Sequence, residues 1–237
     1  MAHMSVSVVL PAYNEAENLP NVLSRIHEIL GALAWDYELI VVDDGSTDNT
    51  AQVLAGTDSQ QLTVVRHEKN KGYGAALKSG FQRASKEWVF FMDSDGQFDI
   101  GEIERLAVFC GAYEMIIGYR AHRRDNNIRL LNAWLFTLAV RMLFGLNVYD
   151  PDCAFKLIRR SVIERARLEA DGALINTELL VRAKKFGAKI KQVPVHHYPR
   201  TKGSSTGGNI KVIARAMKEI ILLRLTGHVR GRKSGFN

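Results

Sequence analysis

Two aspartates one residue apart, Asp93 and Asp95, directly follow the apolar run Trp88–Met92, and Gln97 comes shortly after them. A buried strand gains nothing from ending in two like charges, so these carboxylates require a cation or another positive partner. Carboxylate and amide oxygens suit hard divalent cations such as Mg2+ or Mn2+. The spacing therefore predicts a metal site at Asp93, Asp95 and Gln97, where a cation could bridge a diphosphate and neutralise a leaving phosphate.

The elements that would position these residues alternate between short apolar runs and amphipathic stretches, which is the pattern of β-α-β units. The expected strands are Ser5–Leu10, Tyr37–Val42, Leu62–Val65, Trp88–Met92, Glu114–Gly118 and Ile190–Val195. The expected helices are Glu17–Leu33, Asp48–Leu54, Ala75–Ala84, Ile103–Phe109, Leu130–Phe144, Thr177–Phe186 and Ile210–Leu225. The sequence thus predicts an α/β fold with a mainly parallel central sheet flanked by helices.

Polar residues stand at the ends of four expected strands, at Pro11–Glu15, Asp43–Ser46, Asp93–Asp95 and Gly118–Arg120. The carboxyl ends of parallel strands share one edge of a sheet, and ligands bind in the crevice there. One such group would be ordinary turn chemistry, but four together predict a binding site. The sequence has no Gly-x-x-x-x-Gly-Lys-Ser/Thr phosphate loop and no Gly-x-Gly-x-x-Gly after the first expected strand, so metal and arginines would have to hold any phosphates.

Composition favours one compact domain, residues 5–208, followed by a basic helix and tail, residues 209–237. The chain has 237 residues, 46% of them hydrophobic, and six of its seven net positive charges fall in the tail. A basic tail is attracted to anionic lipid or nucleic acid, although it could also be only a solvated face. Two cysteines, Cys110 and Cys153, are expected to be buried and unpaired, as in a reducing compartment. No secretory signal is expected.

Four ordered motifs resemble those of glycosyltransferase family 2, whose members have the GT-A fold and transfer sugars with inversion at the anomeric carbon. They are Pro11-Ala12-Tyr13-Asn14-Glu15, Val42-Asp43-Asp44-Gly45-Ser46, Asp93-Ser94-Asp95-Gly96-Gln97-Phe98 and Asp152-Cys153-Ala154-Phe155-Lys156-Leu157. Within the family the chain is most similar to the dolichyl- or polyprenyl-phosphate hexosyltransferase branch, over about residues 5–208. It differs in having Ala154-Phe155-Lys156 where many members have Gly-Phe-Arg. Many relatives also carry two membrane-spanning helices after the catalytic domain, and we expect none in this sequence.

The resemblance implies a role for each motif. The residues it assigns to the nucleotide base and ribose are Pro11, Tyr13 and Glu15, with Asp43 or Asp44. It assigns Asp93, Asp95 and Gln97 to the metal on the donor diphosphate, with Asp95 as the most direct ligand. The residues it assigns to the acceptor phosphate or donor diphosphate are Arg120, Arg123, Arg124 and Arg129. A late loop with Arg200, Lys202 and Ser204 would close over the phosphates.

The implied reaction is metal-dependent transfer of a hexose, glucose or mannose, from UDP- or GDP-hexose to a polyprenyl phosphate, with inversion. A lipid phosphate is already ionised near neutral pH, whereas a sugar hydroxyl acceptor would need a carboxylate base. Asp152 is the first candidate for that base and Glu178 the second, unless Glu178 only orders a loop. A hydroxyl acceptor is the alternative reading. A basic nucleic-acid-binding module is a distant one, since no nucleic-acid motif is present.

Two segments could lie on a membrane surface without crossing it, since no stretch reaches the roughly 18 apolar residues of a spanning helix. One is Leu130–Leu146, which contains Trp134 and follows several arginines; it could instead be a core or dimer helix. The other is the amphipathic Ile210–Leu225, which could instead cover the catalytic domain. We expect peripheral association with the anionic cytoplasmic face of a membrane. His196 and His197 are expected to be structural or to contact phosphate rather than to bind metal.

Overall fold

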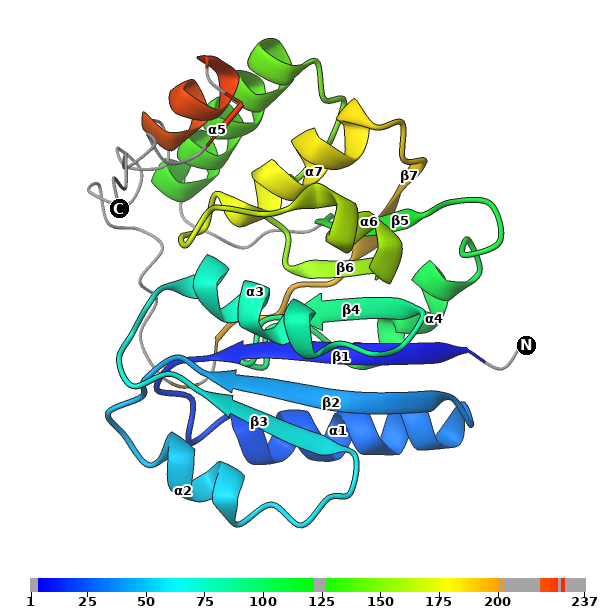
Figure 1. Cartoon of the computed structure of the whole chain (residues 1–237), viewed down its shortest axis with the longest axis vertical. Coiled ribbons are helices and arrows are strands. Elements are labelled where there is room, and N and C mark those ends of the chain that lie inside the picture. Colours follow the sequence, from blue (N-terminus) through cyan, green and yellow to red (C-terminus); the bar gives the residue numbers. More distant parts are fainter. Residues whose placement is uncertain (1–3, 122–126, 201, 203–217, 226, 229–237) are drawn as a thin grey trace, which may run out of the picture.

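Seven strands form one sheet in the order β3-β2-β1-β4-β6-β5-β7 (Figure 1). The computed structural model describes residues 4–121, 127–200, 202, 218–225 and 227–228. The strands are β1 Ser5–Ala12, β2 Asp36–Asp43, β3 Leu62–Arg66, β4 Trp88–Met92, β5 Met115–Arg120, β6 Phe155–Arg159 and β7 Ile190–Val195. All neighbours pair in parallel except β6, which is antiparallel to β4 and β5. The predicted α/β fold with a mainly parallel sheet is confirmed.

The strand β6 was not predicted from the sequence. Its charged residues, Lys156 and Arg159, interrupt the apolar run that identified the other strands. Because β6 runs against its neighbours, its first residue, Phe155, pairs with Met92 at the end of β4. The turn that precedes β6 therefore arrives at the edge where the parallel strands end. This reversal adds residues 150–154 to the edge that carries the predicted site.

Helices cover both faces of the sheet and make it the middle of three layers (Figure 1). They are α1 Leu19–Ala32, α2 Thr50–Ala55, α3 Tyr73–Arg83, α4 Ile103–Ala107, α5 Asn127–Phe144, α6 Arg160–Ala166 and α7 Ile175–Lys185, with a short 3-10 turn η1 at Ile100–Glu102. The helix α6 was not predicted. Of the predicted helix Ile210–Leu225, residues 218–225 are helical, and its earlier part lies outside the described residues.

Alternate residues of the strands enter two separate apolar cores, because successive side chains of a strand point to opposite faces. Val9 and Phe91 pack in the core that holds α3, α6, α7 and Val140 of α5. Val8 and Phe90 pack in the core that holds α1 and α4. The strands β1 and β4 are thus buried on both sides, and their carboxyl ends are fixed in place.

The two cysteines take no part in a disulfide. Cys153 is fully buried, whereas Cys110 is only partly buried, so the expectation that both are buried is wrong for Cys110. Burial raises the pKa of each thiol to about 12. Both are therefore protonated and unreactive near neutral pH.

The helix α3 lies directly on β1 at Gly80, which gives a test of the packing. A Cβ at Gly80 would lie 2.3 Å from Cγ1 of Val9, so Gly80→Ala should lower the free energy of unfolding by about 1–3 kcal/mol. The matched control is Gly31→Ala in α1, where a Cβ meets nothing within 4 Å and should add about 0.5–1 kcal/mol. Denaturant unfolding measures both. Equal effects of the two substitutions would contradict this packing.

Candidate active site

The polar strand ends predicted to converge do meet at one edge of the sheet. The Ser94 hydroxyl donates to the carbonyl of Pro11 over 2.7 Å, which ties the loop after β4 to the end of β1. The amide of Asp44 donates to the carbonyl of Ala12 over 2.8 Å, which ties in the end of β2. The strand order reverses around β1, between β1 and β4, which is the place where open α/β sheets commonly bind ligands.

Asp93 and Asp95 are partly buried carboxylates on the loop after β4. Burial first, and the neighbouring charge of Asp95 second, raise the pKa of Asp93 to about 7. Burial also raises the pKa of Asp95, although the amide of Gln97 donates to its Oδ1 over 3.0 Å. Negative charge is therefore poorly solvated at both residues, and a bound cation would stabilise their ionised forms.

A divalent cation fits this pair if a ligand supplies the remaining oxygens. Within the described ranges, no group of three or more His, Cys, Asp or Glu side chains is placed to hold a metal ion. Mg2+ commonly binds one or two carboxylates together with substrate phosphates and water, rather than an all-protein cage. Gln97 donates through Nε2 to the carbonyl of Tyr198 over 2.8 Å, so its amide oxygen is the atom left to face a cation.

The chain after β7 passes over this carboxylate pair. The amide of Tyr198 donates to the carbonyl of Gln97 over 2.8 Å. The guanidinium of Arg200 bonds to Glu15 and lies 3.7 Å from Oδ2 of Asp95, which is only 12% exposed. Arg200 therefore joins the end of β1 to the loop after β4 and supplies positive charge at Asp95.

The two histidines that follow β7 make protein contacts. Nδ1 of His196 lies 2.5 Å from a carboxylate oxygen of Glu102, and the backbone amide of His196 also donates to Glu102. The ring of His197 lies edge-on to Phe98, with centroids 5.0 Å apart. Both contacts are structural, which is one of the two roles expected for these residues.

Asp44 and Asp43 are almost completely buried at the end of β2. The carboxylate of Asp44 accepts from the amides of Lys71 and Gly72, at 2.9 and 2.8 Å, and lies 2.6 Å from Nδ1 of His67. Asp43 accepts from the amide of Ser46 over 2.8 Å. Asp44 thus anchors the loop before α3, and Asp43 is the member of the pair with fewer internal bonds.

The glycines at the start of α3 allow a close approach of the protein's own backbone. A Cβ at Gly72 or Gly74 would lie 2.5 Å from a carbonyl oxygen, that of Asp171 or Ala170 respectively. The carbonyl of Asp171 accepts from the amide of Gly74 over 2.8 Å and so caps the start of the helix. This short Gly-x-Gly is therefore a helix entry rather than a phosphate cradle.

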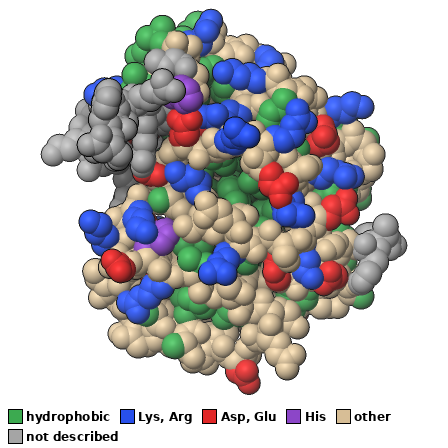
Figure 2. Space-filling view, viewed as in Figure 1, with side chains coloured by type: hydrophobic (Ala, Val, Ile, Leu, Met, Phe, Trp, Pro, Cys, Tyr) green, Lys and Arg blue, Asp and Glu red, His purple; other side chains and the backbone are tan. Residues whose placement is uncertain are grey.

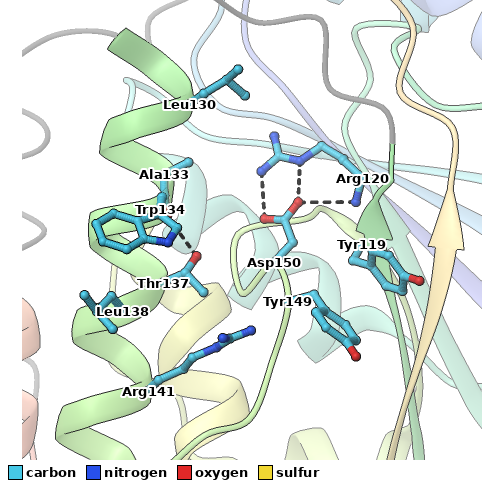
Figure 3. Close-up of a pocket in the computed structure, with 10 residues that line it drawn as sticks. All are labelled: Tyr119, Arg120, Leu130, Ala133, Trp134, Thr137, Leu138, Arg141, Tyr149 and Asp150. Carbon is cyan, nitrogen blue, oxygen red and sulfur yellow. Dashed lines mark hydrogen bonds and ion pairs between the residues drawn. The ribbon is translucent and has the colours of Figure 1, made fainter. Parts of the chain in front are cut away.

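Arg120 at the end of β5 is held by Asp150, a residue that sequence reasoning missed. Its Nε and Nη2 donate to the two carboxylate oxygens of Asp150 over 2.6 and 2.8 Å (Figure 3). Burial lowers the pKa of Arg120, but the hydrogen bond and charge of Asp150 outweigh it, and the net pKa is raised. Asp150 stands two residues before Asp152, the same spacing as in the Asp93 and Asp95 pair, which is the one signal that could have identified it.

The two candidate bases differ in their surroundings. Glu178 is fully buried, accepts from the amides of Glu169 and Ala170, and accepts from Nε of Arg182 over 2.7 Å. It orders the loop before α7, which was the alternative role expected for it, and it is not placed to remove a proton. Asp152 is partly buried on the turn before β6, close enough to Arg120 for its charge to raise the pKa of that guanidinium.

A cavity of about 260 Å³ opens beside Arg120, between α5 and the turn before β6 (Figure 3). Arg120 and Asp150 form one side of it. The helix α5 contributes the other side, with mostly apolar residues: Leu130, Ala133, Trp134, Thr137, Leu138 and Arg141. The cavity thus joins the largely buried ion pair of Arg120 and Asp150 to a mostly apolar wall.

Some predicted site residues lie outside the described part of the chain. They are Arg123, Arg124, Ser204 and the side chain of Arg129. Lys202 is described and exposed, and its carbonyl accepts from Nε of Arg200 over 2.7 Å. Pro11, Tyr13 and Glu15 lie at the end of β1 as expected, with Tyr13 42% exposed toward solvent.

Most of the chain matches the model of a known protein family. The profile of glycosyl transferase family 2 matches residues 7–167, which is more than half of the chain. The chain belongs to glycosyl transferase family 2. The resemblance seen in the sequence motifs is thereby confirmed for the family.

The curated family 2 relatives include two undecaprenyl-phosphate 4-deoxy-4-formamido-L-arabinose transferases. That of Pseudomonas fluorescens is 32% identical over 88% of this chain and 62% of its own length. That of Yersinia enterocolitica is 31% identical over 88% of this chain and 64% of its own length. The chain thus spans less than two thirds of these relatives. Both are named for a polyprenyl-phosphate acceptor, in agreement with the predicted branch.

Solved structures of similar fold include glucosyl-3-phosphoglycerate synthase of Mycobacterium tuberculosis, solved with Mn2+, UDP and phosphoglyceric acid. It has a TM-score of 0.73, 24% identity, and covers 99% of this chain and 81% of its own. The same enzyme solved with Mg2+ and UDP has a TM-score of 0.71 and 22% identity, with 99% and 82% covered. These neighbours confirm the fold of this family 2 chain.

The raised pKa of Asp93 predicts a pH-dependent stability. Between its ordinary pKa of 3.8 and about 7, the native chain holds a proton that the unfolded chain has released, so the free energy of unfolding falls as pH rises through this range. Asp93→Asn removes the titrating group and with it this fall in the free energy of unfolding. In EDTA, its Tm relative to wild type should rise by several degrees between about pH 5 and about pH 8. A difference in Tm that is constant across this range would contradict the assignment.

Proposed function

We propose that this chain transfers a sugar from a nucleotide sugar to a polyprenyl phosphate, with inversion at the anomeric carbon. The observation that carries the proposal is the cavity beside Arg120, because it combines an anion-binding group with an apolar wall. A polyprenyl phosphate has an anionic phosphate, which the anion-binding group would contact, joined to an apolar chain, which the apolar wall would contact. The names of the curated relatives support the same acceptor class.

The donor half of the proposed site is the crevice between β1 and β4. Asp95 and Asp93, with the amide oxygen of Gln97, would hold Mg2+ or Mn2+ on the donor diphosphate. A bound cation of this kind neutralises charge on the departing nucleoside diphosphate. Arg200 lies 3.7 Å from Asp95 and would turn from that carboxylate to the diphosphate.

The nucleotide itself would lie along the ends of β1 and β2. Pro11, Tyr13 and Glu15, with Asp43, would contact its base and ribose, whereas Asp44 is occupied by the loop before α3. UDP and GDP are the candidate nucleotides. For the sugar, glucose and mannose remain the predicted hexoses, and the relatives' names add a modified arabinose.

The acceptor half requires little acid-base chemistry. A phosphate monoester oxygen is already ionised near neutral pH and can attack the anomeric carbon without a strong base. Arg120 would bind and orient this phosphate through its planar guanidinium. Asp152, on the adjoining turn, would become the base if the acceptor were a sugar hydroxyl. Its place beside Arg120 would put this base at the acceptor site.

Transfer of radiolabelled sugar to undecaprenyl phosphate tests the proposal. The double variant Arg120→Gln with Asp150→Asn removes the charge but keeps a hydrogen-bonded pair, so neither partner is left as an unpaired buried ion. It should lower kcat/KM for the lipid about a hundredfold, corresponding to roughly 3 kcal/mol, with donor binding nearly unchanged.

Asp152→Asn is the comparison variant in the same assay. With a phosphate acceptor it should change kcat by less than about tenfold, because no proton has to be removed. Transfer by wild type to a sugar hydroxyl but not to the lipid, abolished in Asp152→Asn, would favour the alternative. No transfer to either acceptor with any UDP- or GDP-sugar would contradict the proposal.

The outer face of α5 would rest on the membrane that holds the acceptor. Large apolar side chains stand exposed there and on the neighbouring residues 218–225: Leu131, Trp134, Leu135, Met142, Ile221 and Leu225. Hydrophobic side chains gather at the upper end of the molecule, where α5 lies, with Lys and Arg around them (Figure 2). Within the described ranges, no helix is long and apolar enough to span a bilayer. The arrangement suits an interfacial helix beside anionic headgroups.

Flotation with anionic liposomes tests this contact. Trp134→Glu places a charge on a side chain that is 60% exposed, and it should reduce the bound fraction severalfold at low salt. Val108→Glu is the matched control, because Val108 is 67% exposed at the end of α4, away from α5. If both variants bind as wild type does, α5 is a packing or assembly helix instead.

A further inference from the structure

A lysine stands completely buried in β6, next to the proposed acceptor site. Lys156 is 0% exposed, and its Nζ donates to the carbonyl of Pro151 over 3.3 Å, to the carbonyl of Cys153, and to Oδ1 of Asn176 over 3.1 Å. Burial lowers its pKa, while the nearby charges of Asp150 and Asp152 act to raise it. An ammonium group in such a place requires compensation, because its desolvation costs several kcal/mol.

The groups that compensate Lys156 belong mainly to the turn before β6. Two of its three hydrogen-bond partners are backbone carbonyls of residues 151 and 153, and the amide of Cys153 donates back to the carbonyl of Asp150 over 3.4 Å. Carbonyls that point inward toward one ammonium fix the path of the backbone between them. The side chain of Asp150, on the same turn, is thereby held against Arg120.

The pairing between Asp150 and Arg120 depends on this path. Both carboxylate oxygens meet the guanidinium edge formed by Nε and Nη2, and Asp150 also accepts from the backbone amide of Arg120 over 3.4 Å. Such a two-point contact tolerates little displacement of either partner. A turn that relaxed by an ångström would rotate the guanidinium that faces the cavity.

We propose that Lys156 is a positioning residue for the acceptor phosphate: it holds the turn before β6 so that Asp150 fixes the guanidinium of Arg120 in the orientation that meets the acceptor. The inference rests on the proposed function for the identity of the acceptor. It adds that the orientation of Arg120 is set from beneath the site, by a group that touches neither substrate.

Lys156→Met is the first test, because Met has a similar length and no charge. With undecaprenyl phosphate as acceptor, kcat should fall and the KM for the lipid should rise, together at least about tenfold in kcat/KM. Lys156 also adds positive charge near Asp93, so the Kd for nucleotide with Mn2+ is measured separately and should change clearly less. Lys156→Gln, which keeps a shorter donor, should change the same parameters in the same direction.

Lys78→Met is the matched control. Nζ of Lys78 also donates to a backbone carbonyl, that of Glu169 over 2.9 Å, and it pairs with Asp171, but these residues belong to the loop before α7 and not to the turn before β6. This variant should lower Tm with kcat and the acceptor KM unchanged. If a general loss of stability were the cause, kcat and the acceptor KM would change alike in both lysine variants. If Lys156 positions Arg120, they change only in the Lys156 variants.

The Nε–H signal of Arg120 in a 1H–15N spectrum gives a readout without substrate, assigned with Arg120→Lys. In wild type it should exchange slowly with solvent, because Nε donates to Asp150 over 2.6 Å. In Lys156→Met and Lys156→Gln it should shift and exchange faster. An unchanged signal together with unchanged kcat and KM would overturn the proposal. If wild type transfers nothing to the lipid but the signal responds as expected, the acceptor assignment fails while the positioning role stands.

Discussion

The arrangement of the site depends on one electrostatic constraint, the presence of Asp93 and Asp95 side by side at the end of a fully buried strand. Burial raises the pKa of both acids, and the charge of Asp95 raises that of Asp93 further, so the ionised pair requires positive charge. The protein supplies part of it. Arg200 approaches Asp95 from the chain after β7, and the charges of Arg120 and Lys156 lower the pKa of Asp93. A cation shared with a diphosphate would supply the rest.

The reversed strand β6 connects the two halves of the site. Six parallel strands bring the donor residues to one edge, and β6 enters the sheet at that same edge, so the turn before it lies beside Asp93 and Arg120. Arg120, Asp150 and Lys156 form a buried charged group between the carboxylate pair and the cavity under α5. The same charges that stabilise Asp93 thus also shape the place where an acceptor phosphate would bind.

Sequence periodicity was sufficient to predict the parallel strands and the edge where they meet, because β1, β2 and β4 are continuous apolar runs ending in polar groups. It failed at β6, where Lys156 occupies a buried position that no apolar pattern predicts. Asp150 was missed for a related reason: its role comes from a contact with Arg120, 30 residues away in the chain. Glu178 was considered as a base because its type and neighbours suggested it, and only its burial and its bonds to Glu169, Ala170 and Arg182 show that it orders a loop.

The most direct test of this account is a calorimetric titration of wild type and Asp95→Asn with UDP and with GDP, each in Mn2+ and in EDTA. The account predicts that wild type binds one of the two nucleotides at least about tenfold more tightly with Mn2+, and that Asp95→Asn loses this difference. Equal affinity in Mn2+ and EDTA, or an undiminished metal effect in Asp95→Asn, would contradict the claim that the paired carboxylates exist to hold a cation on a donor diphosphate.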